Sequence, residues 1–146
     1  MIMLEELNVD NWLKVMELTV SEEQKDIFPI SNVYWVGISR YEEKTTLYAI
    51  KNDELYVGMV GIGYDEDGVS GYINPMMIDE KHQGKGYSKE AMLLAIEKLK
   101  SEYKVSEIHL GHRKNNMKAG KLYESLGFII IDEDEMDYFR KLDLNK

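Results

Sequence analysis

Runs of alternating hydrophobic and polar residues, typical of short strands, are interrupted along this chain by segments with helical spacing. In residues 86–101, Met92, Ile96 and Leu99 recur on one face, with Ala91 and Ala95 beside them, which predicts a helix. Further helices are expected over residues 10–19, 21–28, 31–40 and 116–126, and strands over 3–7, 45–50, 55–62, 71–79, 105–110, 128–131 and 136–142. This order predicts an α+β, or mixed α/β, domain with a largely antiparallel sheet.

Capping and turn residues mark several element ends. Asp10, Ser21 and Ser31 are expected N-caps, because their side-chain oxygens can accept from the first free N–H groups of a helix. Gly127 is expected to end the helix over residues 116–126 in a left-handed conformation. Pro75 cannot donate to a strand ladder, so it predicts a bulge within residues 71–79.

Composition and charge exclude several classes of protein. The length of 146 residues predicts a single domain covering residues 1–146. The chain has no cysteine, which excludes disulfides, thiolate metal sites and a cysteine nucleophile. With no long apolar run and no signal-peptide pattern at the start, we expect a cytoplasmic protein. The net charge of −9 argues against nucleic acid and membrane partners and is compatible with a cationic substrate.

A glycine-containing turn, residues 83–88, joins the predicted strand 71–79 to the strongest helix. Such a turn directs backbone N–H groups to one point at the positive end of a helix dipole, which suits a phosphate. It lacks the Walker A pattern and the third glycine of a dinucleotide fingerprint. The turn is surrounded by one basic cluster, Lys81, His82, Lys85 and Lys89, and residues 111–123 hold a second, His112, Arg113, Lys114, Lys118 and Lys121. Together the two clusters suggest an extended polyanion held near two helix N-termini. Taken alone, the glycines could simply make a tight turn between strand and helix, and each basic residue could simply be solvated on a helix face.

Two segments resemble the GNAT family of N-acetyltransferases. The acetyl-CoA motif Gln/Arg-x-x-Gly-x-Gly/Ala reads here Gln83-x-x-Gly86-x-Ser88, with serine as the last small residue. Residues 116–128 are similar to the family signature Asn-x-x-Ala-x-x-Leu-Tyr-x-x-x-Gly-Phe. The resemblance implies a twisted, mostly antiparallel sheet of about seven strands, flanked by helices and splayed between the fourth and fifth strands.

The resemblance also implies residue roles. The pyrophosphate of acetyl-CoA would bind the backbone of Gln83, Gly84, Lys85, Gly86, Tyr87 and Ser88, and the pantetheine arm would lie along Met76, Met77 and Ile78. Asn116 and Lys121 would contact the coenzyme from the following helix. Tyr123 carries over as the general acid that protonates the leaving thiolate, while the alternative makes it a core residue with Leu122 and Phe128. Without a cysteine, the acceptor amine would attack acetyl-CoA directly.

The resemblance implies a primary amine as the acceptor. Residues 18–28 and Tyr34 are similar to bacterial spermine/spermidine acetyltransferases, which predicts a polyamine held by Glu22, Glu23 and Tyr34; the alternative is an amphipathic helix with a solvated acidic face. A protein N-terminus or lysine as acceptor, or a non-catalytic acyl-CoA-binding module, stays open. The general base also stays open. Members of the family often have an acidic residue on the strand before the glycine turn, where this chain has Asn74. The remaining candidates are Glu22, Glu23, Asp65, Glu66 and Asp67.

Two further expectations concern metals and assembly. His109 and His112 lie three residues apart on a predicted strand and face opposite sides, with no third ligand nearby, so no metal site is expected. An edge strand near residues 136–142 would allow a homodimer.

Overall fold

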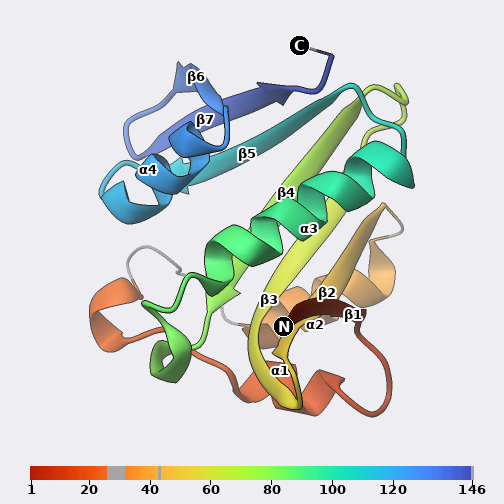
Figure 1. Cartoon of the computed structure of the whole chain (residues 1–146), viewed down its shortest axis with the longest axis vertical. Helices are drawn as coiled ribbons and strands as arrows, with labels where there is room; N and C mark the ends of the chain where they lie inside the picture. The colour runs from red at the N-terminus through yellow and green to blue at the C-terminus, as the bar shows by residue number, and fades with distance from the viewer. Residues whose placement is uncertain (26–31, 43, 146) are drawn as a thin grey trace.

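A seven-stranded sheet forms the centre of the computed structural model, which describes residues 1–25, 32–42 and 44–145 (Figure 1). Its spatial order is β1-β2-β3-β4-β5-β7-β6, and the described strands pair antiparallel except for β4 with β5. This confirms the predicted mixed α+β fold. The strands are β1 (Ile2–Glu6), β2 (Thr45–Asn52), β3 (Leu55–Tyr64), β4 (Ser70–Ile78), β5 (Glu107–Arg113), β6 (Ile129–Glu133) and β7 (Asp137–Asp143).

Helices cover both faces of the sheet. On one face α3 crosses the central strands and α4 lies over the β5–β7 half, while α1 and α2 lie behind (Figure 1). In β2, Tyr48 and Ile50 enter the core on the α3 face, whereas Leu47 and Ala49 enter a second core on the α1–α2 face, as strand alternation requires. The helices are α1 (Trp12–Glu17), α2 (Asn32–Tyr41), α3 (Tyr87–Ser101) and α4 (Met117–Ser125), with 3-10 turns η1 (Glu22–Gln24) and η2 (Glu80–His82).

The bulge predicted at Pro75 is present in β4. Val60 pairs with Met76 and Ile62 with Ile73, so the two residues Asn74 and Pro75 lie opposite Gly61 alone. The extra residue reverses the facing of the strand. Ile73 and Met76 therefore both pack into the core on the α3 face, and Met77 turns to the core on the α1–α2 face.

The splay between the fourth and fifth strands is also confirmed. β4 and β5 pair only over Ser70–Tyr72 and Glu107–His109. Beyond this short parallel ladder, β4 continues to Ile78 and β5 to Arg113 without pairing to one another. The sheet therefore opens at the end where β4 leads into the glycine turn and β5 leads into α4.

The helix caps only partly follow the prediction. Asp10 does not cap α1: Asn8 Oδ1 accepts from the N–H groups of Asp10 (2.8 Å) and Asn11 (3.1 Å) instead, because the helical turn begins at Asn8. Ser21 caps η1, where its N–H donates to Gln24 Oε1 at 3.3 Å in a capping box. Ser31 lies outside the described residues.

Two strand predictions were wrong in extent or place. β5 runs to Arg113, so His112 and Arg113 belong to a strand rather than to the loop before α4. The sheet edge on that side is β6, not residues 136–142, because β7 lies between β5 and β6.

Gly127 has φ 99° after α4, which confirms the positive φ expected there.

Candidate functional site

A cleft of about 370 Å³ lies where the sheet opens, between the end of β4, the glycine turn and α4. It brings together most of the residues predicted to bind acetyl-CoA, although they come from two separate stretches of sequence. Those that line it are Met76, Met77, Ile78, Gln83, Gly84, Gly86, Tyr87, Ser88, Asn116 and Tyr123.

The glycine turn has the backbone shape of an anion site. Gly84 and Gly86 have φ 79° and 81°, and a Cβ at either would meet nothing within 4 Å. Glycine is therefore needed there for conformation, not for space. Gly86 is the N-cap of the 15-residue α3, so the free N–H groups of Tyr87 and Ser88 lie at the positive end of the helix.

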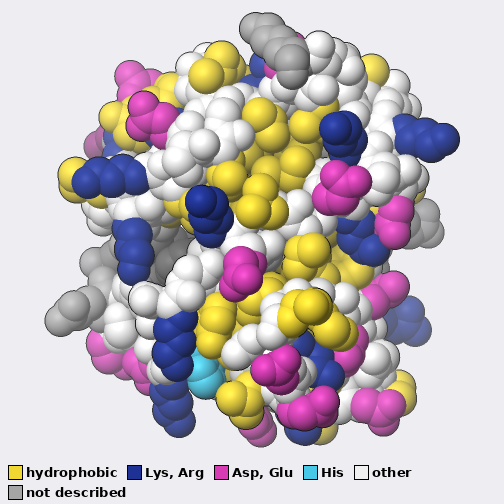
Figure 2. Space-filling view, in the orientation of Figure 1, with side chains coloured by type: hydrophobic (Ala, Val, Ile, Leu, Met, Phe, Trp, Pro, Cys, Tyr) yellow, Lys and Arg dark blue, Asp and Glu magenta, His cyan; other side chains and the backbone are white. Residues whose placement is uncertain are grey.

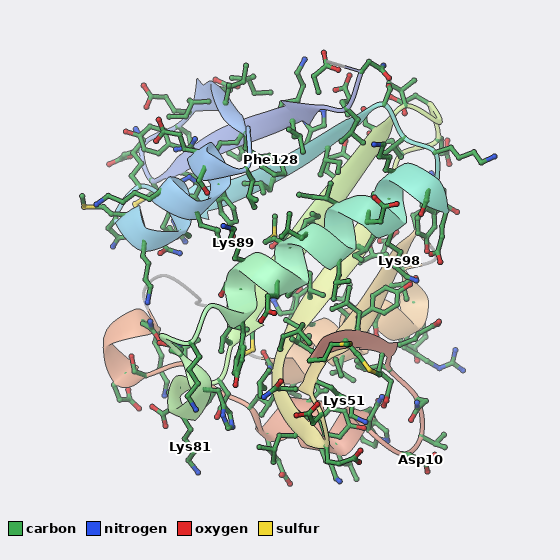
Figure 3. All side chains as sticks on the ribbon, viewed as in Figure 1. Asp10, Lys51, Lys81, Lys89, Lys98 and Phe128 are labelled. Carbon is green, nitrogen blue, oxygen red and sulfur yellow. The ribbon has the colours of Figure 1, made fainter. Side chains whose placement is uncertain are left out.

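Positive side chains surround part of this cleft. Figure 2 shows Lys and Arg side chains gathered on the side of the molecule where the glycine turn and α4 lie. His82, Lys89 and Lys118 line the cleft, and Lys89 lies between the start of α3 and α4 (Figure 3). Lys81 points into solvent (Figure 3). Lys85 and Lys121, both predicted contacts of the coenzyme, are not part of the cleft wall.

The second basic cluster does not act as one surface. His112 is held within the fold by Arg140, Arg113 lies 3.6 Å from Asp137, and Lys114 pairs with Glu133 at 3.0 Å. Of the five members of this cluster, Lys118 alone lines the cleft.

Met76, Met77 and Ile78 form one wall of the cleft beyond the splay. Because β5 no longer pairs with β4 there, the side of β4 that faces β5 has no strand partner among the described residues. An extended ligand can bind to that edge as an additional strand.

Tyr123 forms the inner wall of the cleft from α4. It is only 8% exposed, with ring centroids 5.6 Å from His112 and 6.1 Å from Phe128. Burial raises its pKa to about 12, while the positive charge of Arg140 acts in the opposite direction. The phenol is thus neutral at pH 7 and carries a proton. Tyr123 is therefore packed in the core, as the alternative to a catalytic role predicted, and it also lines the cleft.

A second cavity of about 720 Å³ lies beside the first, and Met77 lines both. Its walls come from the end of α1 and the segment after it, α2, the bulge, the end of β5 and β7. Two carboxylates, Glu17 and Asp137, face it. Sequence reasoning missed both, because they are far apart in the chain and no local pattern joins them. Its other residues include Thr19, Lys25, Asn32, Trp35, Asn74, Pro75, His112, Arg113 and Phe139.

Polar contacts tie the segment after α1 to the glycine turn. The side-chain amides of Gln24 and Gln83 bond reciprocally at 3.0 and 2.8 Å, and Gln83 Nε2 also donates to Ile78 O at 2.9 Å. The buried Asp79 accepts from Thr19 N–H at 2.9 Å, and Glu80 N–H donates to Thr19 O at 2.9 Å. The walls of the two cavities are therefore mechanically joined.

The residues predicted to hold the acceptor lie elsewhere or are not described. Glu22 is exposed and pairs with Lys25 at 2.7 Å, and Tyr34 is exposed; neither lines the two cavities. The side chain of Glu23 lies outside the described part of the chain.

The base candidates of the β3–β4 turn all have local partners. Asp65 accepts from the Tyr72 hydroxyl, Glu66 pairs with Lys44 at 2.5 Å, and Asp67 accepts from the N–H groups of Val69 (2.8 Å) and Ser70 (3.0 Å). None of the three lines either cavity.

The two histidines have separate partners. His109 contacts Glu107 at 2.5 Å, whereas His112 Nε2 accepts from Arg140 Nε at 2.9 Å. Within residues 1–25, 32–42 and 44–145, no group of three potential metal-binding side chains comes together. The helices of the same residues include none that is long and apolar enough to cross a membrane.

Comparison with known proteins gives consistent matches. A model described as the acetyltransferase (GNAT) family matches residues 6–128. The chain is 31% identical over 125 residues to a spermine/spermidine N(1)-acetyltransferase of Bacillus subtilis, covering 82% of each chain.

Solved structures share the fold over nearly the whole chain. A spermidine N-acetyltransferase from Vibrio cholerae, in complex with CoA and spermine, aligns with a TM-score of 0.81 at 16% identity, covering 99% of this chain and 96% of that one. The Campylobacter jejuni N-acetyltransferase PseH, in complex with acetyl coenzyme A, aligns with a TM-score of 0.73 at 20% identity, covering 98% and 99%.

Proposed function

Because the chain belongs to the acetyltransferase (GNAT) family and is thus an N-acetyltransferase, we propose that it transfers acetyl from acetyl-CoA to a polyamine such as spermidine or spermine. The observation that carries this proposal is the pair of cavities that meet at Met77, one with an anion cradle and one with two carboxylates. The relative from Bacillus subtilis, named for the same acceptors, supports this choice of amine.

The smaller cleft fits the donor. The N–H groups at Gly84, Gly86 and the first turn of α3 suit a pyrophosphate, and the unpaired edge of β4 suits the amide-bearing pantetheine arm. Asn116 Oδ1 accepts from Ala119 N–H at 3.3 Å and caps α4, which leaves its Nδ2 group to donate to the coenzyme. Lys85 and Lys121 remain predicted contacts for the outer part of the ligand.

The larger cavity fits the acceptor. Deprotonating an amine of pKa near 10.4 at pH 7 costs about 4.6 kcal/mol, so a nearby base is needed. Glu17 or Asp137, directly or through a water molecule, holds the ammonium group and takes its proton.

Tyr123 completes the reaction. The neutral amine attacks the thioester carbonyl beside Met77, and the C–S bond breaks. The new amide nitrogen releases its extra proton to water, and the Tyr123 hydroxyl gives its proton to the departing sulfur. The products are an N-acetyl amine and a free thiol, and the tyrosine recovers its proton from solvent.

Thiol release from acetyl-CoA against a panel of amines tests the proposal. Spermidine and spermine should support release, and Tyr123→Phe should lower kcat about 10²- to 10⁴-fold with little change in acetyl-CoA affinity. Tyr41→Phe, at a tyrosine that is 87% exposed, is the matched control and should keep the wild-type rate. Glu17→Gln and Asp137→Asn should raise KM for spermidine.

Other outcomes overturn parts of the proposal. Saturable acetyl-CoA binding without thiol release for any amine would identify an acyl-CoA-binding module. Peptides that outcompete spermidine would move the acceptor to a protein N-terminus or lysine. Full activity of Tyr123→Phe, with chemistry rate-limiting, would remove the general-acid role.

A further inference from the structure

Arg140 is a buried arginine without a carboxylate. It comes from β7 and is 7% exposed, and no Asp or Glu of the described residues lies within 4.0 Å of it. Its hydrogen-bond partners His112 and Phe128 are both neutral: Nε donates to His112 Nε2 at 2.9 Å and Nη1 donates to Phe128 O at 3.1 Å. Burying an uncompensated guanidinium disfavours folding, which suggests a task other than stability.

Both partners of Arg140 flank Tyr123. The rings of His112 and Phe128 lie 5.6 and 6.1 Å from the Tyr123 ring, and Phe128 N–H donates to Tyr123 O at 3.0 Å. Figure 3 places Phe128 between α4 and the sheet. Arg140 thus binds the ring of His112 and the backbone carbonyl of Phe128, two residues whose rings both contact that of Tyr123.

The bonds of His112 determine its protonation. Its Nδ1 lies 2.9 Å from Arg113 O, and a carbonyl can only accept, so the proton is on Nδ1 and the Nε2 lone pair accepts from Arg140. Burial lowers the pKa of His112, and the charge of Arg140 lowers it further. The ring is neutral and does not cancel the charge behind Tyr123.

We propose, on the basis of the function proposed above, that Arg140 is a positioning residue for the general acid Tyr123. It holds the ring of His112 and the backbone of Phe128, which both lie beside Tyr123, and places a positive charge near the phenol. When Tyr123 gives up its proton to sulfur, negative charge develops on its oxygen in a site where water is scarce, and a fixed cation there stabilises that charge. The other titratable groups on the cleft wall are His82, Tyr87, Lys89 and Lys118.

α4 approaches this arrangement at Gly120. A Cβ at that position would lie 3.2 Å from His112 Cε1 and 3.6 Å from Arg140 Nη2. The helix that carries Tyr123 therefore packs directly on His112 and Arg140, so these two side chains determine the position of Tyr123.

The test combines kinetics with a titration of Tyr123 itself. Arg140→Met removes the charge but keeps bulk, Arg140→Lys keeps the charge but cannot hold both partners, and Lys141→Met is the control on the next residue of β7, where the side chain faces the opposite way. Full-length protein labelled with difluorotyrosine, whose phenol ionises at lower pH than that of tyrosine, is titrated by fluorine NMR. The Tyr123 signal is assigned by its loss in Tyr123→Phe.

We expect Arg140→Met to raise the pKa of the labelled phenol by about one unit and to lower kcat about 10- to 100-fold, with the Kd of acetyl-CoA unchanged. Arg140→Lys should show a wild-type phenol pKa and an intermediate kcat, and Lys141→Met should match wild type. If Arg140→Met fails to fold, the Lys variant decides on kcat.

A purely structural role gives a different result. It predicts a lower thermal midpoint for Arg140→Met, with an unmoved Tyr123 signal and a wild-type kcat per folded molecule, and this outcome overturns the proposal. The titration needs no substrate. If wild type releases no thiol, the proposed function fails, while the Tyr123 signal still decides whether Arg140 sets the acidity of the phenol.

Discussion

A methyl group added at Gly61 is a direct test of how the β4 bulge is held. Its Cβ would lie 2.3 Å from Asn74 O, 2.9 Å from the Asn74 carbonyl carbon and 2.9 Å from Pro75 Cδ. These atoms belong to the backbone or to the proline ring, so no side-chain rotation relieves the overlap. β3 and β4 must move apart between the Val60–Met76 and Ile62–Ile73 pairs.

We expect Gly61→Ala to lower the free energy of unfolding by about 2–3 kcal/mol, measured by urea unfolding followed by circular dichroism. Because Asn74 and Pro75 line the larger cavity, KM for the amine should rise more than the Kd of acetyl-CoA.

The matched control is Gly37→Ala in α2. That glycine is exposed, and an added Cβ meets nothing within 4 Å, so the change should stabilise the protein by about 0.5–1 kcal/mol. A Gly61→Ala protein within about 0.5 kcal/mol of wild type would show that the strands are not held as described.

Three other changes test the site and its supports. Gln24→Ala removes the paired amide bonds to Gln83, so the free energy of unfolding should fall by about 1–2 kcal/mol. Acetyl-CoA should also bind more weakly, as measured by calorimetry. An unchanged Kd would show that these bonds do not support the smaller cleft. Gly86→Ala, at φ 81°, should cost about 1 kcal/mol in urea unfolding and weaken acetyl-CoA binding, unless the turn tolerates a side chain. Folding lowers the pKa of His112, so the unfolded chain binds its proton more readily and stability should fall as pH drops below about 6.5. Urea unfolding at several pH values should show a weaker acid slope in His112→Phe, and equal slopes would contradict the assignment.

The cleft proposed to bind the donor was largely predictable from sequence because its parts are local. The glycine turn, the helix that follows it and the strand before it are contiguous, and the second motif places Asn116 and Tyr123 within one helix and its cap. Local rules for dipoles, caps and proline determine their shape. The predicted bulge at Pro75 and the positive φ at Gly127 follow from the same kind of rule.

The acceptor side was much less predictable because it is assembled from distant segments. Glu17 comes from α1 and Asp137 from β7, and only the order of strands in the sheet brings them to one cavity. The expectation for the acceptor residues rests on a resemblance within residues 18–28 and Tyr34 and on their charge, and Glu22 instead pairs with Lys25 in solvent. A charged residue near a motif gives no indication of which way its side chain points.

By itself, the sequence determined the class of fold, the glycine turn at the start of α3 and the place of Tyr123 on α4, since each depends on residues within a turn or two of one another. Tertiary structure alone decided that His112 turns inward to Arg140, that β6 rather than β7 forms the edge, and that two carboxylates share a cavity. The physical reason is that these relations depend on strand pairing and on the facing of side chains, which a single bulge or a change of strand order reverses.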